Sequence, residues 1–162
     1  CHATLLAVAT GRPVKLIYRR DEDLRATTKR HPAIITIRSV AGLDGELLEK
    51  PADEDDAVRM LLRLQGRTHD VVTAVALRAG ETVFEAVDVT AVTFRPAREG
   101  MLRAYVRTGE PMDKAGAYGI QGYGAALVER IDGDFFGVMG LPIRLVLDLL
   151  AEAGFPYEFP RR

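Results

Sequence analysis

Cysteine is nearly absent from this sequence, and its scarcity limits the available chemistry. Of the 162 residues only Cys1 is a cysteine, which excludes an internal disulfide framework and a cysteine-based metal site. A reducing cytoplasm is therefore the simplest setting. The chain begins with this Cys rather than Met, which we interpret as a fragment, a processed product or an incomplete gene model.

Charge of one sign and long apolar runs are also lacking. With 22 basic and 23 acidic residues, the formal net charge is -1. This balance gives no electrostatic reason to expect binding to a nucleic-acid polymer or to an anionic membrane. No run has the length of a membrane span, and no basic start with an apolar middle indicates a signal peptide. A small anionic ligand stays compatible with the charge, because a local cluster of donors binds it whatever the total.

Several catalytic signatures are missing as well. No G-x-x-x-x-G-K-[ST] loop and no Ser/His/Asp grouping is present. His2, His31 and His69 lack the mutual spacing of a metal site. His69, which follows Thr68 and opens a strand pattern, is interpreted as a satisfied core or strand-edge histidine.

Hydrophobic periodicity predicts one α/β domain over residues 1–162, with no internal repeat and no linker. The expected elements, in chain order, are a strand at 14–18, a strand over 33–45 with a turn at Asp44-Gly45, a helix ended by Gly66, two antiparallel strands over 69–95, a helix over 97–107, a hairpin over 125–140 and a helix over 141–154. The acidic run at 53–56 lies where a helix dipole favours negative charge, so we prefer a helix start to a metal site there.

The stretch "DKAGAYGIQGYG", residues 113–124, has neither helical nor strand periodicity. Its glycines permit close approach of the backbone to a ligand, and exposed N–H groups can cradle phosphate. Asp113 is a candidate for binding a cation or positioning a water, and Lys114 for neutralising phosphate. Gln121 carries donors and an acceptor suited to the edge of a nucleobase. A purely structural loop, with glycines at positive φ, explains the same residues equally well.

A second polar motif, "LEKP" at 48–51, follows a predicted strand and turn and precedes a predicted helix. Ligand contacts in α/β folds often lie at such junctions. Lys50 is the natural phosphate partner, and Glu49 is a candidate metal or water contact. An exposed Glu–Lys ion pair is the competing interpretation.

Several blocks in one order resemble the Maf family of nucleoside triphosphate pyrophosphatases. They are "LDGELLEKPADEDDAVRMLLRLQGRTHDVVTAVAL", "VTFRP" and "YVRTGEPMDKAGAYGIQGYGAALVERIDGDFFGVMGLP". The resemblance covers residues 43–150, leaves 1–42 as a divergent or incomplete N-terminal part and 151–162 as a tail. It implies a mixed twisted sheet flanked by helices, with a two-lobed cleft like that of inosine triphosphatases. It also implies hydrolysis of a nucleoside triphosphate to monophosphate and pyrophosphate, with Mg²⁺ or Mn²⁺ held by residues not identified in this sequence.

The resemblance also assigns roles to single residues. "DKAGAYGIQG" is similar to the branch that acts on dTTP and UTP, so the loop would line the nucleotide pocket with Gln121 as the substrate-selecting residue. Asp113 and Lys114 belong to the same substrate-binding loop. Lys50 matches the family's active-site lysine in "EKP", and Glu49 stands beside it. A homodimer is compatible with the family, although no segment identifies an interface.

Two family motifs depart from the pattern. The N-terminal "SxSPRR"-like segment is not recognisable, and Arg19 and Arg20 echo it only faintly. In the ungapped alignment of the "GADT" motif, Arg38 stands at the position of the catalytic Asp and Ser39 at that of the Thr. An Arg there places a permanent cation where a carboxylate would bind metal or water. A degenerate protein that binds nucleotide or a partner without hydrolysis, and a partial chain with the family fold only in its second half, are the alternatives.

Overall fold

The computed structural model describes residues 14–17, by their backbone, and residues 33–159. Arg19, Arg20, His2 and His31 lie outside the described residues. Contacts divide the chain into two compact units. One includes the chain up to Arg38, Ala74–Val87 and the chain from Ile143, and the other comprises Ser39–Thr73 and Asp88–Pro142. The predicted site residues from Ser39 to Gln121 all belong to the second unit.

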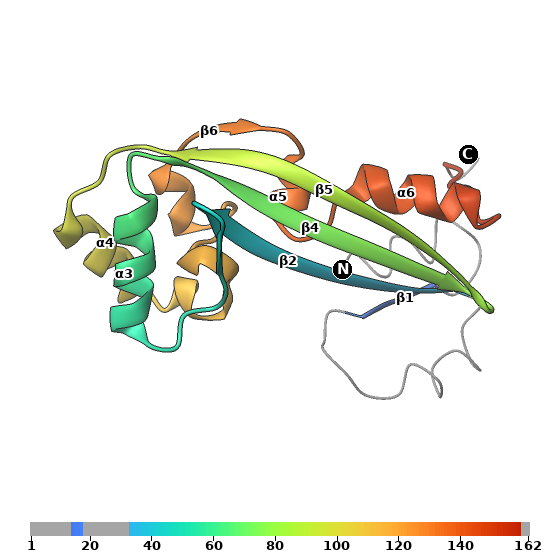
Figure 1. Ribbon diagram of the computed structural model, residues 1–162, viewed down its shortest axis with the longest axis horizontal. Coiled ribbons are helices and arrows are strands. Elements are labelled where there is room, and N and C mark those ends of the chain that lie inside the picture. Colours follow the sequence, from blue (N-terminus) through green and yellow to red (C-terminus); the bar gives the residue numbers. More distant parts are fainter. Residues whose placement is uncertain (1–13, 18–32, 160–162) are drawn as a thin grey trace. The chain divides into compact units, whose positions relative to one another are not determined.

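The described strands form a mixed sheet, which together with the helices confirms the predicted α/β class (Figure 1). They pair in the order β1-β2-β4-β5-β6, with β3 on β2. The pair β1–β2 is parallel, whereas β2–β3 and β5–β6 are antiparallel. The strands are β1 (Val14–Ile17), β2 (Ala33–Leu43), β3 (Glu46–Leu48), β4 (Thr68–Ala79), β5 (Thr82–Phe94) and β6 (Val128–Asp132).

Local sequence explains the strand ends. Asp44 and Gly45 have φ values of 54° and 80°, as a tight turn with two left-handed residues requires, and they join β2 to β3 as predicted. Gly80 and Glu81 join β4 to β5, inside the region predicted as two antiparallel strands. Alternate residues of β4 from His69 to Leu77 are buried, so the period of two in the sequence is the burial pattern of the strand.

The predicted helices at 57–64, 97–107 and 141–154 are confirmed in type and place. The described helices are α3 (Glu54–Leu64), α4 (Glu99–Val106), α5 (Phe135–Val138) and α6 (Ile143–Glu152), and the short 3₁₀ helices are η1 (Glu110–Asp113), η2 (Ala115–Ala117) and η3 (Tyr123–Leu127). The acidic run opens α3 as expected. The Asp53 carboxylate accepts from Asp56 N at 2.7 Å, and Asp56 in turn accepts from Ala52 N at 2.9 Å. The Asp53 cap thus satisfies an amide that the first helical turn leaves unpaired, and the Asp56 side chain reaches back to the residue before the cap.

The predicted hairpin over 125–140 is wrong in its second half. Residues 135–138 form α5 instead of a strand, and only Val128–Asp132 is extended. Asp134 caps this helix, because its Oδ1 accepts from Phe136 N at 2.8 Å. The apolar run after Asp134 is too short for its periodicity to distinguish a strand from a helix. The side-chain cap from Asp134, which follows Gly133, favours the helix.

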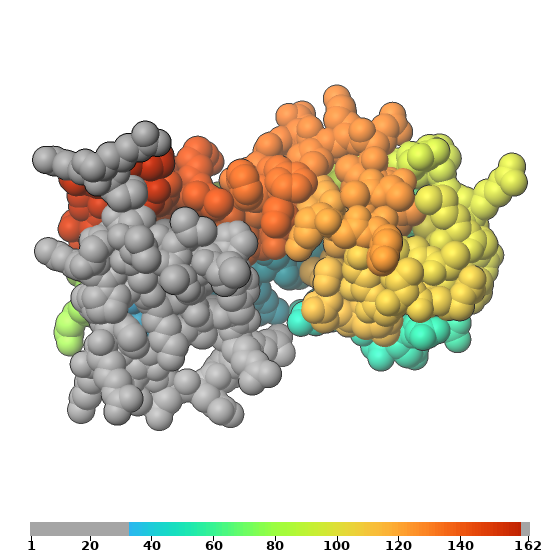
Figure 2. Space-filling model, turned by 180° about the vertical axis from the view of Figure 1, so that it is seen from behind, coloured from blue at the N-terminus to red at the C-terminus, as the bar shows by residue number. Residues whose placement is uncertain are grey.

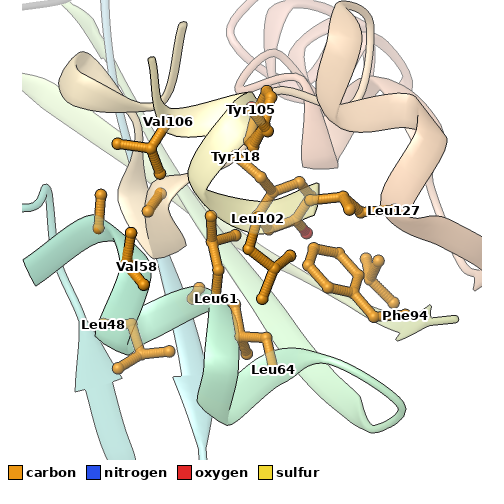
Figure 3. Packing of buried hydrophobic residues seen from close by; sticks show 14 of the residues in the cluster. Leu48, Val58, Leu61, Leu64, Phe94, Leu102, Tyr105, Val106, Tyr118 and Leu127 are labelled. Atoms are coloured by element: carbon orange, nitrogen blue, oxygen red, sulfur yellow. The ribbon is translucent and has the colours of Figure 1, made fainter. Parts of the chain in front are cut away.

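Helices α3 and α4 lie side by side in the second unit (Figure 1). Between them, and under the end of β5, lies the main hydrophobic cluster, shown in Figure 3. Leu61, Leu64 and Leu102 are fully buried there. The same cluster includes Ala117, Tyr118 and Ile120 from the glycine-rich segment and Leu127 just after it. Packing in the core therefore fixes the irregular loop in place. No described helix is long and apolar enough to cross a membrane.

Candidate functional site

The segment that carries Glu49 and Lys50 is held at both ends. Leu48 is buried and pairs with Ala41 in the β2–β3 ladder. After the two polar residues, Pro51 is buried and the amide of Ala52 is fixed by the α3 cap. Glu49 and Lys50 are exposed between these anchors. The predicted position of "EKP" between a strand and a helix is therefore confirmed.

The glycine-rich segment folds as two short 3₁₀ helices around an exposed turn. The residues from Gly116 to Ile120 are buried, whereas Gln121 is exposed. Gly116 at φ 71° and Ala117 at φ 58° both adopt the left-handed region, which glycine tolerates and alanine reaches at some cost. Gln121 thus follows a buried stretch and is itself exposed to solvent. Figure 2 shows the segment of η1 to η3, in yellow to orange, on the surface.

The structure brings the two predicted motifs together. Gly116 N donates to the Glu49 carbonyl at 3.2 Å, and η2 contacts both β3 and α3. A Cβ on Gly116 would lie 2.9 Å from the Cβ of Ala41, closer than side chains pack. A glycine is therefore required where the loop meets β2, and this contact places residues 113–117 beside Glu49 and Lys50.

Charges of both signs meet at this junction. Lys114 Nζ lies 2.6 Å from Asp113 Oδ1. That hydrogen bond, followed by the charges of Lys114 and Lys50, holds the pKa of Asp113 below its usual value despite partial burial. Among the causes that lower this pKa the charge of Lys50 is the smallest, so residues of both motifs act on the same carboxylate. Lys50 is exposed, so an anionic ligand can reach its ammonium from solvent.

Ser39 belongs to a different polar contact. Its Oγ lies 2.7 Å from Thr73 Oγ1, and Thr73 donates to the Gly137 carbonyl at 2.9 Å. Ser39 precedes Ala41 by two residues, so both side chains lie on one face of β2, about 7 Å apart along the strand. The structure thus places Ser39 on the strand face that meets the loop, without a direct bond to Lys50 or Gln121.

Sequence reasoning missed Glu110 and Tyr105. Tyr105 donates from its hydroxyl to Glu110 Oε1 at 2.9 Å, and the Glu110 carboxylate also accepts from the amides of Tyr123 and Gly124. These side chains come from α4 and η1 and hold the loop from its inner side. Their signal in the sequence was a lone Glu immediately before Pro111, at the edge of the glycine-rich block.

His69 is a core residue, as the sequence indicated, but it is only partly satisfied, because its buried Nδ1 has no hydrogen-bond partner among the described residues. Its ring is 3% exposed and its Nε2 lies 2.9 Å from Tyr118 Oη. The rings of Phe94 and Tyr118 pack edge-on against it, at centroid distances of 5.1 Å and 5.4 Å. Burial lowers the pKa of His69 to about 4, against a smaller opposite effect of Asp70. A neutral histidine therefore supports the strand under the loop.

The described residues supply few metal ligands. Within residues 33–159, no group of three or more His, Cys, Asp or Glu side chains is placed to hold a metal ion. Glu49 and Asp113 are the exposed carboxylates of the two motifs. Mg²⁺ commonly binds through one or two carboxylates together with substrate phosphates and waters. The donor set therefore fits a metal that arrives on a phosphorylated ligand better than a preformed protein cage.

This arrangement suits a nucleotide. Lys50 and Lys114 provide cations for phosphate oxygens, and the exposed Gln121 offers amide groups for a base edge.

Comparison with known proteins points the same way. A family model described as Maf-like protein matches residues 7–153. The dTTP/UTP pyrophosphatase of Symbiobacterium thermophilum is 44% identical over 153 residues, which cover 93% of this chain and 79% of the relative. The dTTP/UTP pyrophosphatase of Bacillus velezensis is 48% identical over 119 residues, covering 74% of this chain and 63% of that protein. The nucleoside triphosphate pyrophosphatase of Haemophilus ducreyi is 46% identical over 127 residues, covering 78% and 64%. The chain thus spans less than two thirds of the last two relatives.

Proposed function

Because the chain belongs to the Maf family, we propose that it hydrolyses nucleoside triphosphates of the dTTP/UTP type to the monophosphate and pyrophosphate. The observation that carries this proposal is the junction of the two motifs. There Gly116 N donates to the Glu49 carbonyl, and the charge of Lys50 contributes to the lowered pKa of Asp113. Relatives named dTTP/UTP pyrophosphatase support the choice of substrate class.

In this proposal the cleaved bond is the α–β phosphoanhydride. Water attacks the α-phosphorus and loses a proton to solvent, while the bond from that phosphorus to the bridging oxygen breaks. Negative charge grows on the non-bridging and leaving oxygens, and pyrophosphate departs. Lys50 stabilises that charge through its ammonium, and Lys114 binds the phosphate chain. Glu49 beside Lys50 orients the attacking water. Lys50 and Glu49 are exposed, and Lys114 is partly buried beside Asp113.

Recognition of the base is assigned to Gln121. Its amide presents an acceptor and two donors, which match the alternating carbonyl and N–H groups on the edge of thymine or uracil. Ser39 supports the phosphate side of the site from β2, through its hydroxyl.

A divalent cation, Mg²⁺ or Mn²⁺, completes the proposal. Glu49 and Asp113 would hold it together with the substrate phosphates, and its chemistry there is neutralisation of phosphate charge. We further place the protein in the cytoplasm, as a single Maf-like domain over residues 1–162. We propose that it forms a homodimer and that neither a nucleic-acid polymer nor a membrane is its partner.

A panel of nucleoside triphosphates tests the proposal. Purified protein is incubated with dTTP, UTP, CTP, ATP and GTP, with Mg²⁺, with Mn²⁺ and after chelation, and pyrophosphate is measured. The proposal predicts metal-dependent release with dTTP and UTP preferred. A folded protein that binds dTTP without releasing pyrophosphate would contradict it and identify a protein reduced to binding.

A further inference from the structure

Glu110 makes an unusually complete set of contacts for a carboxylate near the surface. Its Oε1 accepts from Tyr105 Oη at 2.9 Å and from Gly124 N at 2.9 Å, while Oε2 accepts from Tyr123 N at 2.7 Å. A carboxylate offers acceptors only, so all its partners must be donors, as they are here. Charge-assisted hydrogen bonds of this kind are stronger than neutral ones.

Tyr105 extends this grip to the other side of the exposed turn. Its hydroxyl donates to Glu110 and accepts from Gly119 N at 3.0 Å. The ring is buried, and burial raises the pKa of its phenol, which keeps the hydroxyl protonated. Tyr105 and Glu110 thus tie amides on both sides of Gln121, at residues 119, 123 and 124.

Gly122 and Gly124 leave room for the side chains of this arrangement. A Cβ on Gly122 would overlap the Glu110 carboxylate, whereas one on Gly119 would meet the flexible end of Lys114, 2.8 Å from its Cε. A Cβ on Gly124 would lie 2.7 Å from the hydroxyl of Tyr105. The backbone therefore closes directly on the side chains that hold it.

We propose that Glu110 and Tyr105 form a positioning pair that fixes residues 119–124 and thereby sets the nucleotide selectivity of Gln121. Neither side chain needs to touch the substrate, because the hydrogen-bonded amides on either side of Gln121 fix the position of its backbone. This inference rests on the proposed function, since it concerns the substrate preference of the same site. Partial burial raises the pKa of Glu110, but hydrogen bonds from Gly124, Tyr123 and Tyr105 and the charge of Lys114 outweigh it and lower the pKa overall. Glu110 is therefore an ionised acceptor at neutral pH.

Glu110→Gln is the direct test, because it keeps the shape of the side chain and replaces one acceptor oxygen with a donor that faces an amide. Glu99→Gln is the matched control. Glu99 is also a partly exposed Glu of this region, but it pairs with Arg103 on the surface of α4. The pyrophosphate assay is run on dTTP and ATP for the wild type and both variants, together with hydrogen exchange at the amides of Tyr123 and Gly124.

For Glu110→Gln we expect a KM for dTTP raised about tenfold, a kcat within about threefold of the wild type and a dTTP-to-ATP preference reduced about tenfold, because misplacement of a positioning group mainly weakens recognition. Exchange at the two amides accelerates, and Glu99→Gln matches the wild type. A merely structural role would lower the amount of folded protein and leave KM and selectivity unchanged.

Each other outcome is decisive. A folded Glu110→Gln variant with wild-type KM and selectivity overturns the inference. Should that variant not fold, Tyr105→Phe, which keeps the buried ring and removes only the hydroxyl, must show the same loss of selectivity; failure of both to fold assigns the pair a structural role and overturns the inference. An inactive wild type refutes the proposed function and the selectivity role with it, while unchanged exchange at Tyr123 and Gly124 refutes the positioning itself.

Discussion

At the scale of single residues, Lys50 and Gln121 carry the two halves of the proposed recognition. We expect Lys50→Ala to lower kcat/KM about a hundredfold, because it removes a cation from oxygens where charge develops. Gln121→Ala should mainly raise KM and weaken the preference for dTTP over ATP, about tenfold. Arg144→Ala, which removes an exposed cation paired with Asp148 on α6, is the control and should match the wild type. Wild-type turnover in both site variants would show the site assignment to be wrong.

By its resemblance to the Maf motif, Arg38 is predicted to stand at the position of the family's catalytic Asp. Arg38→Asp restores a carboxylate at the position of the family's general base and is expected to raise pyrophosphate release about a hundredfold, the usual contribution of such a base. Arg38→Gln separates loss of the cation from gain of the carboxylate and should raise the rate less. Initial rates on dTTP decide between them. Equal rates in the wild type and both variants would mean that position 38 does not limit turnover.

At the scale of elements, the loop depends on Gly116. Gly116→Ala adds left-handed strain of about 1 kcal/mol and a close contact with Ala41 that costs about 1–3 kcal/mol more. Gly45→Ala is a matched control, because its φ of 80° brings the same strain with no atom within 4 Å of the new Cβ. Urea unfolding should show a larger loss for Gly116→Ala, accompanied by lost turnover. Equal losses would mean that the contact with β2 is unimportant.

The elements also show how far the sequence could lead. The turn at Asp44-Gly45, the cap at Asp53 and the buried strand from His69 were predictable, because each is decided by residues close together in the chain. The hairpin at 125–140 failed for the same reason, since the Asp134 cap outweighed an ambiguous apolar run. Glu110 was not predictable, because its partners at 105, 123 and 124 meet only in the folded chain.

Within the candidate site the sequence identified the polar side chains but not their grouping. Lys50 and Asp113 are 63 positions apart by their numbers, and the packing of Gly116 on Ala41 together with its hydrogen bond to the Glu49 carbonyl brings their motifs together. Ser39, on the same strand as Ala41, lies 2.7 Å from Thr73 Oγ1 of β4. Pairing across strands is a tertiary property that a motif does not encode.

For the molecule as a whole, His69 gives stability a pH dependence. Its pKa is lowered to about 4 in the folded protein from an unperturbed 6.5, so the unfolded chain binds the proton more readily between these values. The contribution of His69 to the free energy of unfolding is fully present above pH 6.5 and is lost as the pH drops toward 4. Between pH 7 and pH 5 we expect a loss of about 2 kcal/mol from this residue.

Urea unfolding at a series of pH values checks this, with His69→Gln as the comparison. The variant starts less stable, because it loses the packing against Phe94 and Tyr118, but its free energy of unfolding should change less between pH 7 and pH 5. The low pKa values of Asp56 and Asp113 matter only at lower pH. Parallel pH profiles for the two proteins would contradict a neutral, buried His69.

The most direct test of the central claim is the identity of the products. With dTTP and Mg²⁺, ³¹P NMR of the reaction separates cleavage between the α- and β-phosphates from cleavage between the β- and γ-phosphates. We predict that the wild type forms dTMP and pyrophosphate in equal amounts. We also predict that Lys50→Ala forms both products more slowly than the wild type. Formation of dTDP and inorganic phosphate, or no product from a folded protein, would contradict it.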